Sequence, residues 1–338
     1  MPNTQDCSVG FGVESIYDTL VTPTRWVEFT DEDLQFSPMR KQGKGLRVGG
    51  RLARSGRRVT TGLEAGGPVE LEAVTKGLGL LFKAIFGNGV SNLVSGSTYQ
   101  QQFTLGDVLD SLTIQKGVVR ENGTVDPTTF GGMVVETAEF AAELDEIVKI
   151  KVEFDGSGQV NNSTGYTAPS YPTSPNLFTF THGALFSGTF TAPTTTALAS
   201  AASSIANVTE FALTVDNKNT GGSRAFGSAG RRATKPRPGD RTEGLKGKLK
   251  TIYTDTTWRD AARDDTDLSL VLTFTSAEAL STGFATLQFA IPCIRLEPTT
   301  PTANGGEVSE VEYDFTVLDN LTAAQPFWLN VRTADTAL

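Results

Sequence analysis

Alternating apolar and polar positions recur along the chain and predict β-strands. The clearest run is 308–317, where Val311, Tyr313, Phe315 and Val317 share one face. Strict alternation of this kind is typical of a strand that is buried on one side only. The same pattern occurs at 146–154, 267–275 and 284–291, and we expect Pro292 to end the last of these strands. The fold class is therefore predicted to be mainly β.

Helical spacing is confined to two short segments. Between residues 74 and 86, Leu78, Leu81, Phe82 and Ile85 fall on one helical face, and Gly87 supplies a stop signal. Residues 257–265 form a shorter candidate, with Thr256 or Thr257 as its N-cap. The pattern predicts few helices.

The order of these elements repeats. In the first half a strand at 25–36, a basic glycine-rich loop at 40–66 and a strand at 69–74 precede the helix and further strands. The second half repeats this order with a strand at 208–215, a basic loop at 219–243 and a strand at 245–253. A Gly-Gly pair also precedes a late strand in each half, at 131–132 and 305–306. The order favours an ancient duplication.

Composition sets the boundaries of the two halves. Residues 155–176 are rich in Gly, Ser, Thr, Asn and Pro and predict a long surface loop. We therefore expect a first β domain at 1–155, a linker or insertion at 156–207 and a second β domain at 208–338. The 35 glycines suit many short strands and turns. No signal peptide or membrane-spanning stretch is evident, so we expect a soluble protein that is made in a cytoplasm.

Charge is distributed unevenly. The net charge is −9, yet 40–58 carries eight basic residues and no acidic ones. The segment 224–250 carries nine basic residues against Asp240 and Glu243, and the rest of the chain has a net charge of −24. An acidic body with two basic loops suits self-association. Loops rich in arginine also bind nucleic acids, but Phe226 is the only aromatic residue in the two segments, so protein partners are favoured.

Catalytic and metal-binding patterns are missing from the sequence. His182 is the only histidine, which disfavours Ser-His-Asp and Cys-His arrangements, and there is no phosphate-binding loop motif. Cys7 and Cys293 are expected to be free thiols. We predict no enzymatic activity, no metal and no cofactor.

Several short motifs resemble one known family when they are taken in order. They are Gly10-Phe11-Gly12-Val13-Glu14-Ser15-Ile16-Tyr17-Asp18-Thr19 with Thr22-Pro23, Pro68-Val69-Glu70-Leu71, Gly77-Leu78-Gly79-Leu80-Leu81 with Phe86-Gly87, and Gly244-Leu245-Lys246-Gly247. In this order the motifs are similar to those of the major tail tube proteins of bacteriophages with long non-contractile tails. The resemblance extends from about residue 10 to 332.

The resemblance implies a tail-tube-type β-sandwich with a flanking helix. In that family, inner sheets of neighbouring copies join into a closed β-barrel ring, and rings stack into a tube through a long loop between early strands. Six domain copies close a ring, so a duplicated chain needs three copies, or six if it is not duplicated. The implied partners are the chain itself, the tape measure protein and the tail terminator and distal tail proteins. Double-stranded DNA passes through without specific binding, which places the protein in the virion tail, and no membrane is involved.

The same comparison suggests which residues form contacts. The predicted inter-ring residues are basic and lie in the two loops: Arg47, Arg51, Arg54, Arg57, Arg58, Arg231, Arg232, Lys235, Arg237 and Arg241. Glu310, Glu312 and Asp314 are candidates for a lumen face that repels phosphates, and a solvated outer strand face is the alternative. Twenty-four strands at ~4.8 Å spacing and ~40° tilt would leave a bore of about 40 Å.

A second functional hypothesis is a β-sandwich binding module of the adhesin type, from a phage or a bacterium. Such a module would present exposed aromatic residues or Asp- and Asn-rich tips, whereas these loops carry arginine and glycine. The sequence therefore favours a structural protein that assembles with itself.

Overall fold

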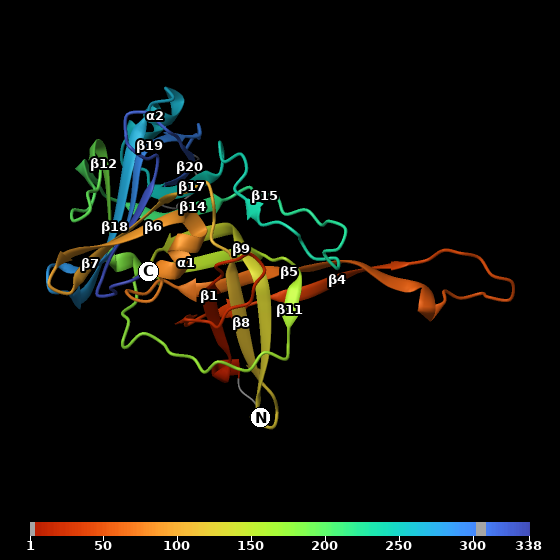
Figure 1. The fold of residues 1–338 in the computed structure, drawn as a ribbon. Coiled ribbons are helices and arrows are strands. Elements are labelled where there is room, and N and C mark those ends of the chain that lie inside the picture. Colours follow the sequence, from red (N-terminus) through yellow and green to blue (C-terminus); the bar gives the residue numbers. More distant parts are fainter. Residues whose placement is uncertain (1–3, 302–308) are drawn as a thin grey trace.

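A computed structural model describes residues 4–301 and 309–338 (Figure 1). The elements of the first half are η1 (Thr4–Asp6), β1 (Ser8–Val13), β2 (Arg25–Val27), β3 (Asp31–Glu32), β4 (Gln35–Gln42), η2 (Ser55–Arg57), β5 (Arg58–Glu72), α1 (Gly79–Phe86), β6 (Gly87–Ser95), β7 (Thr98–Leu105), β8 (Leu112–Val119), β9 (Val125–Glu143), β10 (Lys149–Asp155) and β11 (Gln159–Asn161). Those of the second half are η3 (Phe180–His182), β12 (Gly183–Thr191), β13 (Ser200–Ile205), β14 (Val208–Asp216), β15 (Thr220–Gly221), β16 (Pro236–Arg237), β17 (Leu245–Ile252), α2 (Thr257–Arg263), β18 (Leu268–Ala279), β19 (Phe284–Leu296), β20 (Glu310–Val317) and β21 (Trp328–Thr333). The prediction of a mainly β protein is confirmed.

Eight strands follow one another in a continuous antiparallel run, β4-β5-β10-β9-β14-β17-β20-β19. The junction between the two halves is the pairing of β9 with β14, in which Phe140 lies opposite Leu213. We call this run the long sheet. Among the described strands β4 pairs only with β5, so the long sheet has an open edge and a single chain contains no closed barrel.

The strand pairing has the same order in both halves. In the first half, β4, β5, β10, β9, β8 and β1 are successive neighbours. In the second half, β14, β17, β20, β19, β18 and β12 are successive neighbours, and they occupy the same places in chain order. A strand that follows β10 or β20 also returns to pair with β9 or β19, namely β11 and β21. The β6–β7 hairpin, which pairs with β21, follows α1 but has no described counterpart after α2.

The helices match the predictions in position and each differs at one end, since α1 begins later than predicted and α2 ends at Arg263 instead of residue 265. α1 begins at Gly79 rather than at residue 74, and every residue in it except Lys83 is buried. Gly87 ends the helix with φ +94°, a conformation that favours glycine. At α2 the N-cap is Thr256, one of the two predicted residues, but its side chain makes no cap hydrogen bond. The Asp255 carboxylate accepts from the Thr257 amide instead, at 2.8 Å.

Two strand predictions are wrong for local reasons. β19 continues past Pro292 to Leu296, because the register with β18 shifts between Leu268 and Leu270. Such an irregularity accepts a residue that lacks an amide hydrogen. The predicted strand at 25–36 is broken into β2, β3 and the start of β4. Part of the predicted loop at 40–66 is strand, because β5 begins at Arg58.

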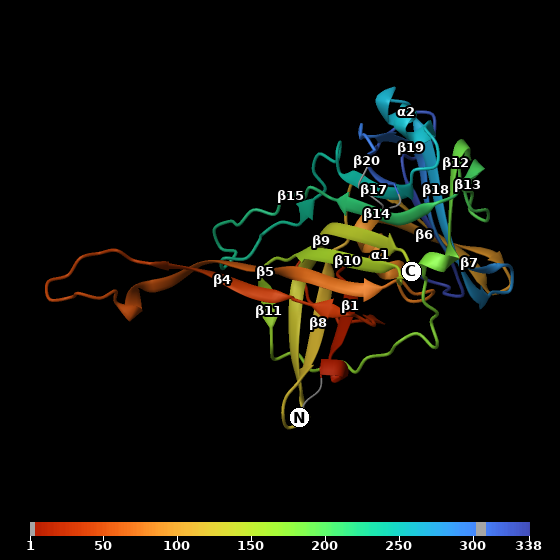
Figure 2. The same cartoon turned by 180° about the vertical axis from the view of Figure 1, so that it is seen from behind.

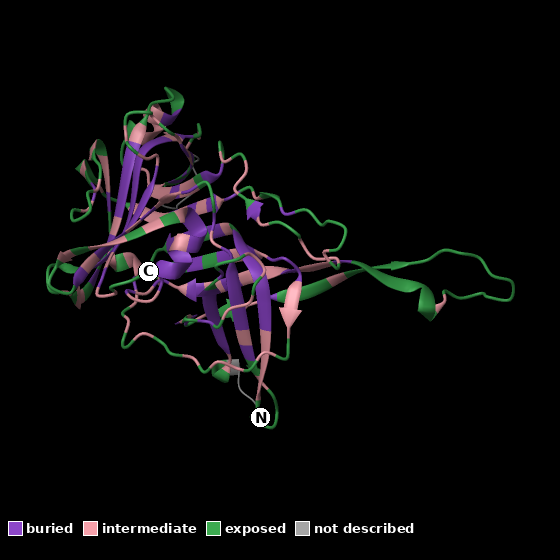
Figure 3. Cartoon of the chain, in the orientation of Figure 1, coloured by how far each residue is buried: buried purple, intermediate pink, exposed green. Residues whose placement is uncertain are grey.

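One hydrophobic core runs through both halves. Phe140 from β9 packs against Phe86 of α1 at 6.2 Å and Phe289 of β19 at 5.2 Å, measured between ring centroids. Phe289 in turn contacts Phe211 of β14 at 5.7 Å. Figure 3 shows buried residues concentrated in the body and exposed residues along a projecting hairpin. The packing gives the halves a shared interior, and the division at 155 and 208 stays a prediction.

Candidate assembly surfaces

A long hairpin projects from the body along the direction of β5 (Figures 1 and 2). We call residues 35–66, which comprise β4, the connecting loop and the first part of β5, the arm. Leu46, Val48 and Leu52 near its end have relative exposures of 101, 100 and 88%. Covering such exposed apolar side chains with a partner removes them from water and so stabilises the complex.

The cations of the arm are held by no carboxylate of the described chain. None of its eight basic residues forms an ion pair among residues 4–301 and 309–338. Five of the ten predicted inter-ring residues lie on this hairpin: Arg47, Arg51, Arg54, Arg57 and Arg58. Their role between rings stays a prediction.

The second basic loop, residues 217–244, lies against the first half of the chain. Arg231 forms an ion pair with Asp18 at 3.1 Å, and Arg232 forms one with Asp155. Arg224 donates to the Leu63 carbonyl at 2.8 Å, so this loop also contacts the part of the arm nearest the body.

Three other predicted residues of this loop differ in their surroundings. Lys235 donates to the Leu109 carbonyl at 2.7 Å, and Arg241 donates to the Gly106 carbonyl at 3.0 Å. Burial lowers the pKa of Arg241. Arg237 is exposed in β16, where it pairs with Thr220. The two basic loops are alike in composition, and only the tertiary structure separates a projecting loop from one that packs on its own chain.

The candidate lumen residues lie on the solvated face of the long sheet. Glu310 and Glu312 alternate with the buried Val311 and Tyr313, as predicted. Across the ladder, Glu312 pairs with Lys248 at 2.9 Å and Glu310 with Lys250 at 2.6 Å. The hydrogen bond that Lys248 donates to Glu312, and then the negative charge of Glu312, raise the pKa of Lys248.

The first half places opposite charges on the equivalent strands. Lys151 of β10 pairs with Glu70 of β5 at 2.7 Å, so here the acid lies on β5 and the base on β10. By strand alternation the solvated face carries the carboxylates Glu64, Glu70, Glu72, Glu139, Glu143, Glu153, Asp155, Glu210, Asp216, Glu310, Glu312 and Asp314, with the bases Lys149, Lys151, Lys246, Lys248, Lys250 and Arg295. Alternation alone places Lys149 and Lys151 outward on their strand, but which carboxylates the lysines meet depends on the register between strands.

Other kinds of site are weakly represented. In the described parts of the chain, no group of three or more His, Cys, Asp or Glu residues is arranged to hold a metal ion. His182 accepts from the Thr179 amide through Nδ1 at 3.2 Å and so stabilises a turn. No helix among the described residues is long and apolar enough to cross a membrane.

The fold and these surfaces define a β-rich structural protein with one charged sheet face and a projecting arm. The chain belongs to the phage tail tube protein family, whose sequence model matches residues 4–317. It is therefore a structural component of a bacteriophage tail, as its motifs indicated. Comparison with curated proteins returns no match.

Proposed function

We propose that three copies of this chain close a ring through their long sheets and that the rings stack into the tube through which the genome leaves the virion. The observation that carries the proposal is the β9–β14 junction, where two halves of equal strand order pair edge to edge within one sheet. Two similar units that are joined side by side by backbone hydrogen bonds resemble neighbours in a closed barrel. The repeated strand order also supports a duplication of the domain.

The number of strands fits this ring. The long sheet contains eight strands, four from each half. Three chains then supply the twenty-four strands that enclose a bore of about 40 Å. The open edge formed by β3 and the first residues of β4 would pair with the end of β19 beyond Ile294 in the next copy, where β18 no longer pairs, which removes exposed strand edges.

The charged face of the long sheet is the proposed lumen. Each lysine that contacts a phosphate releases counterions and slows the passage of DNA. Lys151, Lys248 and Lys250 are each held by a carboxylate on the neighbouring strand, and carboxylates outnumber lysines on this face. Such a surface repels DNA overall, so duplex DNA passes without specific binding.

The remaining proposals concern partners at the ends and between rings. The arm, with its exposed cations, is the proposed inter-ring contact. The tape measure protein inside the tube and the terminator and distal tail proteins at its ends are proposed partners through the family. Assembly would take place in the host cytoplasm.

Polymerisation is the first test. Purified protein at high concentration should form rings or tubes with a bore wider than duplex DNA, as seen by negative-stain electron microscopy. The physical reason is that the open sheet edge and the exposed apolar side chains of the arm both gain partners on assembly. Protein that stays monomeric at high concentration over a range of salt would contradict the proposal.

The lumen face gives a second test. Replacing Glu310 and Glu312 with Gln frees Lys248 and Lys250, so tubes of the variant should bind short duplex DNA with an affinity that falls as salt rises. A filter-binding assay measures this. The matched control replaces Glu121 with Gln and Asp6 with Asn, which removes the same charge elsewhere on the surface. Equal DNA binding by variant and wild-type tubes would exclude this face as the lumen.

A further inference from the structure

A pocket lies at the end of the second half that faces away from the arm. Its volume is about 460 Å³, and it is lined by Ile205, Asn207, Ile252, Asp255, Trp258 and Tyr313 among others. Ile252 ends β17 opposite Glu310, whereas the arm joins the opposite end of the long sheet through β5. Figure 1 shows the arm and α2, which borders the pocket, on different sides of the body.

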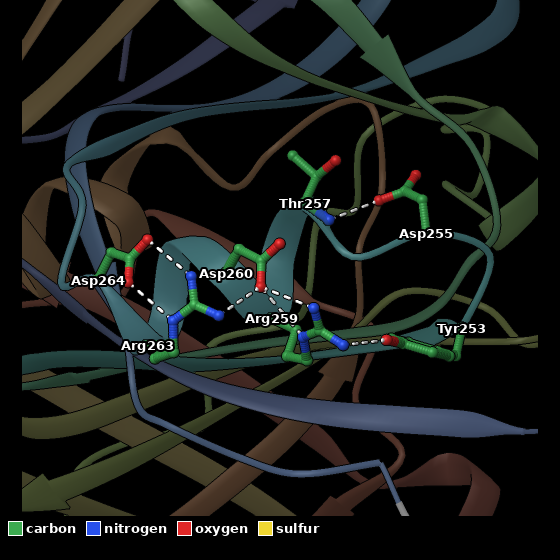
Figure 4. A network of polar contacts seen from close by, with 7 residues as sticks. All are labelled: Tyr253, Asp255, Thr257, Arg259, Asp260, Arg263 and Asp264. Carbon is green, nitrogen blue, oxygen red and sulfur yellow. Dashed lines mark hydrogen bonds and ion pairs between the residues drawn. The ribbon is translucent and has the colours of Figure 1, made fainter.

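The pocket is lined by apolar and polar side chains together, with Asp255 as the one carboxylate among the lining residues that the structure describes. The Trp258 and Tyr313 rings pack 6.1 Å apart, and Ile205 and Ile252 are partly exposed. Figure 4 shows Arg259, Asp260, Arg263 and Asp264 paired along α2, with Asp255 beside Thr257 at its start. Hydrogen bonds from the Thr257 backbone and side chain lower the pKa of Asp255. Residues 253–268 contain five aspartates, of which four pair with arginines: Asp260, Asp264, Asp265 and Asp267. Asp255 is the one of the five without an ion pair to the described residues.

The first half contains an equivalent place, and the chain itself fills it. Glu72 ends β5 opposite Lys149, as Ile252 ends β17 opposite Glu310. Only about 20 Å³ remains there, because Tyr171, Pro172 and Pro175 line it. These three residues belong to 162–179, between β11 and η3, which we call the interdomain segment.

The interdomain segment is firmly held in this place. The Thr75 amide donates to the Asn176 carbonyl at 2.9 Å, and the Asn176 amide donates to Thr75 Oγ1 at 3.0 Å. Pro172 packs so closely on Gly77 that an added Cβ would lie 2.7 Å from its ring. The place in the first half is thus occupied by the chain itself. The equivalent place beside α2 is left open by the described residues.

We propose that the pocket beside α2 is the acceptor for the arm of a copy in the adjacent ring. The inference rests on the proposed tube function and names the partner surface of the arm. Leu46, Val48 and Leu52 of the arm supply apolar side chains for the pocket, and the arm cations face the Asp255 carboxylate in its lining. Arginine suits such pairing because its guanidinium binds carboxylates in a bidentate way.

Number and reach agree with this assignment. Among the described residues each chain has one projecting arm, since the second basic loop packs on its own body, and only the second of the two equivalent places is left open. Each side of the arm has about 16 residues, so the arm extends at most about 50 Å. The seven residues of β10 span about 23 Å across the long sheet, so the arm is longer than the sheet that it must cross. One donor and one acceptor at opposite ends make a head-to-tail contact that repeats without closing.

Cross-linking in assembled tubes tests the contact. Leu52→Cys is combined with Ala206→Cys at the pocket in a Cys7→Ser background. Cys293 is buried, and burial is the main cause that raises its pKa to about 11, so it reacts slowly. A short bismaleimide should produce a ladder of chain multimers on a denaturing gel. Leu52→Cys with Thr173→Cys, on the filled place of the first half, is the matched control and should give little product.

A blocking variant provides an independent measurement. Ala206→Trp fills the pocket from an exposed position and should leave rings that stack at least tenfold less often, whereas Ala202→Trp, exposed on β13 outside the pocket, should form ordinary tubes. Normal tubes from Ala206→Trp would show that the pocket is not the acceptor. Tubes of Leu52→Cys with Ala206→Cys that give no cross-linked multimers would show the same. Either result would leave the tube function standing. Failure of the wild-type chain to form rings or tubes would overturn both.

Discussion

Glu14 shows how a single residue of the amino-terminal motif acts through packing. Its side chain is 7% exposed and accepts from Thr113 Oγ1 at 3.0 Å, the Gly132 amide at 2.9 Å and the Asp18 amide at 2.9 Å. One carboxylate thus joins the end of β1 to β8 and to the Gly-Gly pair of the first half, which lies inside β9 and not before a strand as predicted. The pair at 305–306 lies outside the described residues. The motif that resembles the family is therefore a structural junction.

We expect Glu14→Ala to lower the free energy of unfolding by about 1–3 kcal/mol, because buried donors lose their acceptor. Urea unfolding followed by circular dichroism measures the change. Glu14→Gln keeps an acceptor oxygen and should cost less, and Glu121→Ala on an exposed turn should cost almost nothing. An Ala variant as stable as the wild type would show that the junction is not needed for the fold.

The arm is the element in which charge bears most directly on assembly. Its glycines, among them Gly49 with φ +79°, make it costly to order, so contacts with a partner must offset that entropy. Replacing Arg51, Arg54, Arg57 and Arg58 together with Glu should leave the fold intact, since all four lie outside the core.

Stacking of this variant should fail, because attractive contacts become repulsive at each junction between rings. Electron microscopy should show rings without tubes, and circular dichroism should match the wild type. Arg120→Glu, on the exposed turn after β8, is a control that should still form tubes. Ordinary tubes from the fourfold variant would exclude these arginines as the ring-to-ring contact.

At the scale of the whole molecule, the proposed duplication fixes the number of chains in a ring. If each half acts as one tube domain, a density map should show three chains per ring with approximate sixfold symmetry. The reason is that the β9–β14 junction inside one chain takes the place of an interface between two chains. A ring of six whole chains would contradict the three-chain ring, although a tube could still form.

The sequence by itself determined the character of the elements. Alternation in 310–317 predicted a strand buried on one face, and the apolar cluster before Gly87 predicted α1 and its end. These features depend on a few neighbouring residues, so their pattern is readable locally. The family motifs could also be recognised in the sequence. Their glycines have a structural reason, because a Cβ at Gly10 or Gly12 would lie within 3 Å of Trp26 or Thr22.

Only the tertiary structure decided which partners those elements meet. Lys248 and Lys250 lie far from Glu310 and Glu312 in sequence, so only strand register could pair them. Likewise two loops of similar charge separate into an arm and a packed segment because Asp18 and Asp155 lie beside only one of them. Local pattern fixes secondary structure, whereas burial and ion pairing depend on contacts between residues distant in the chain.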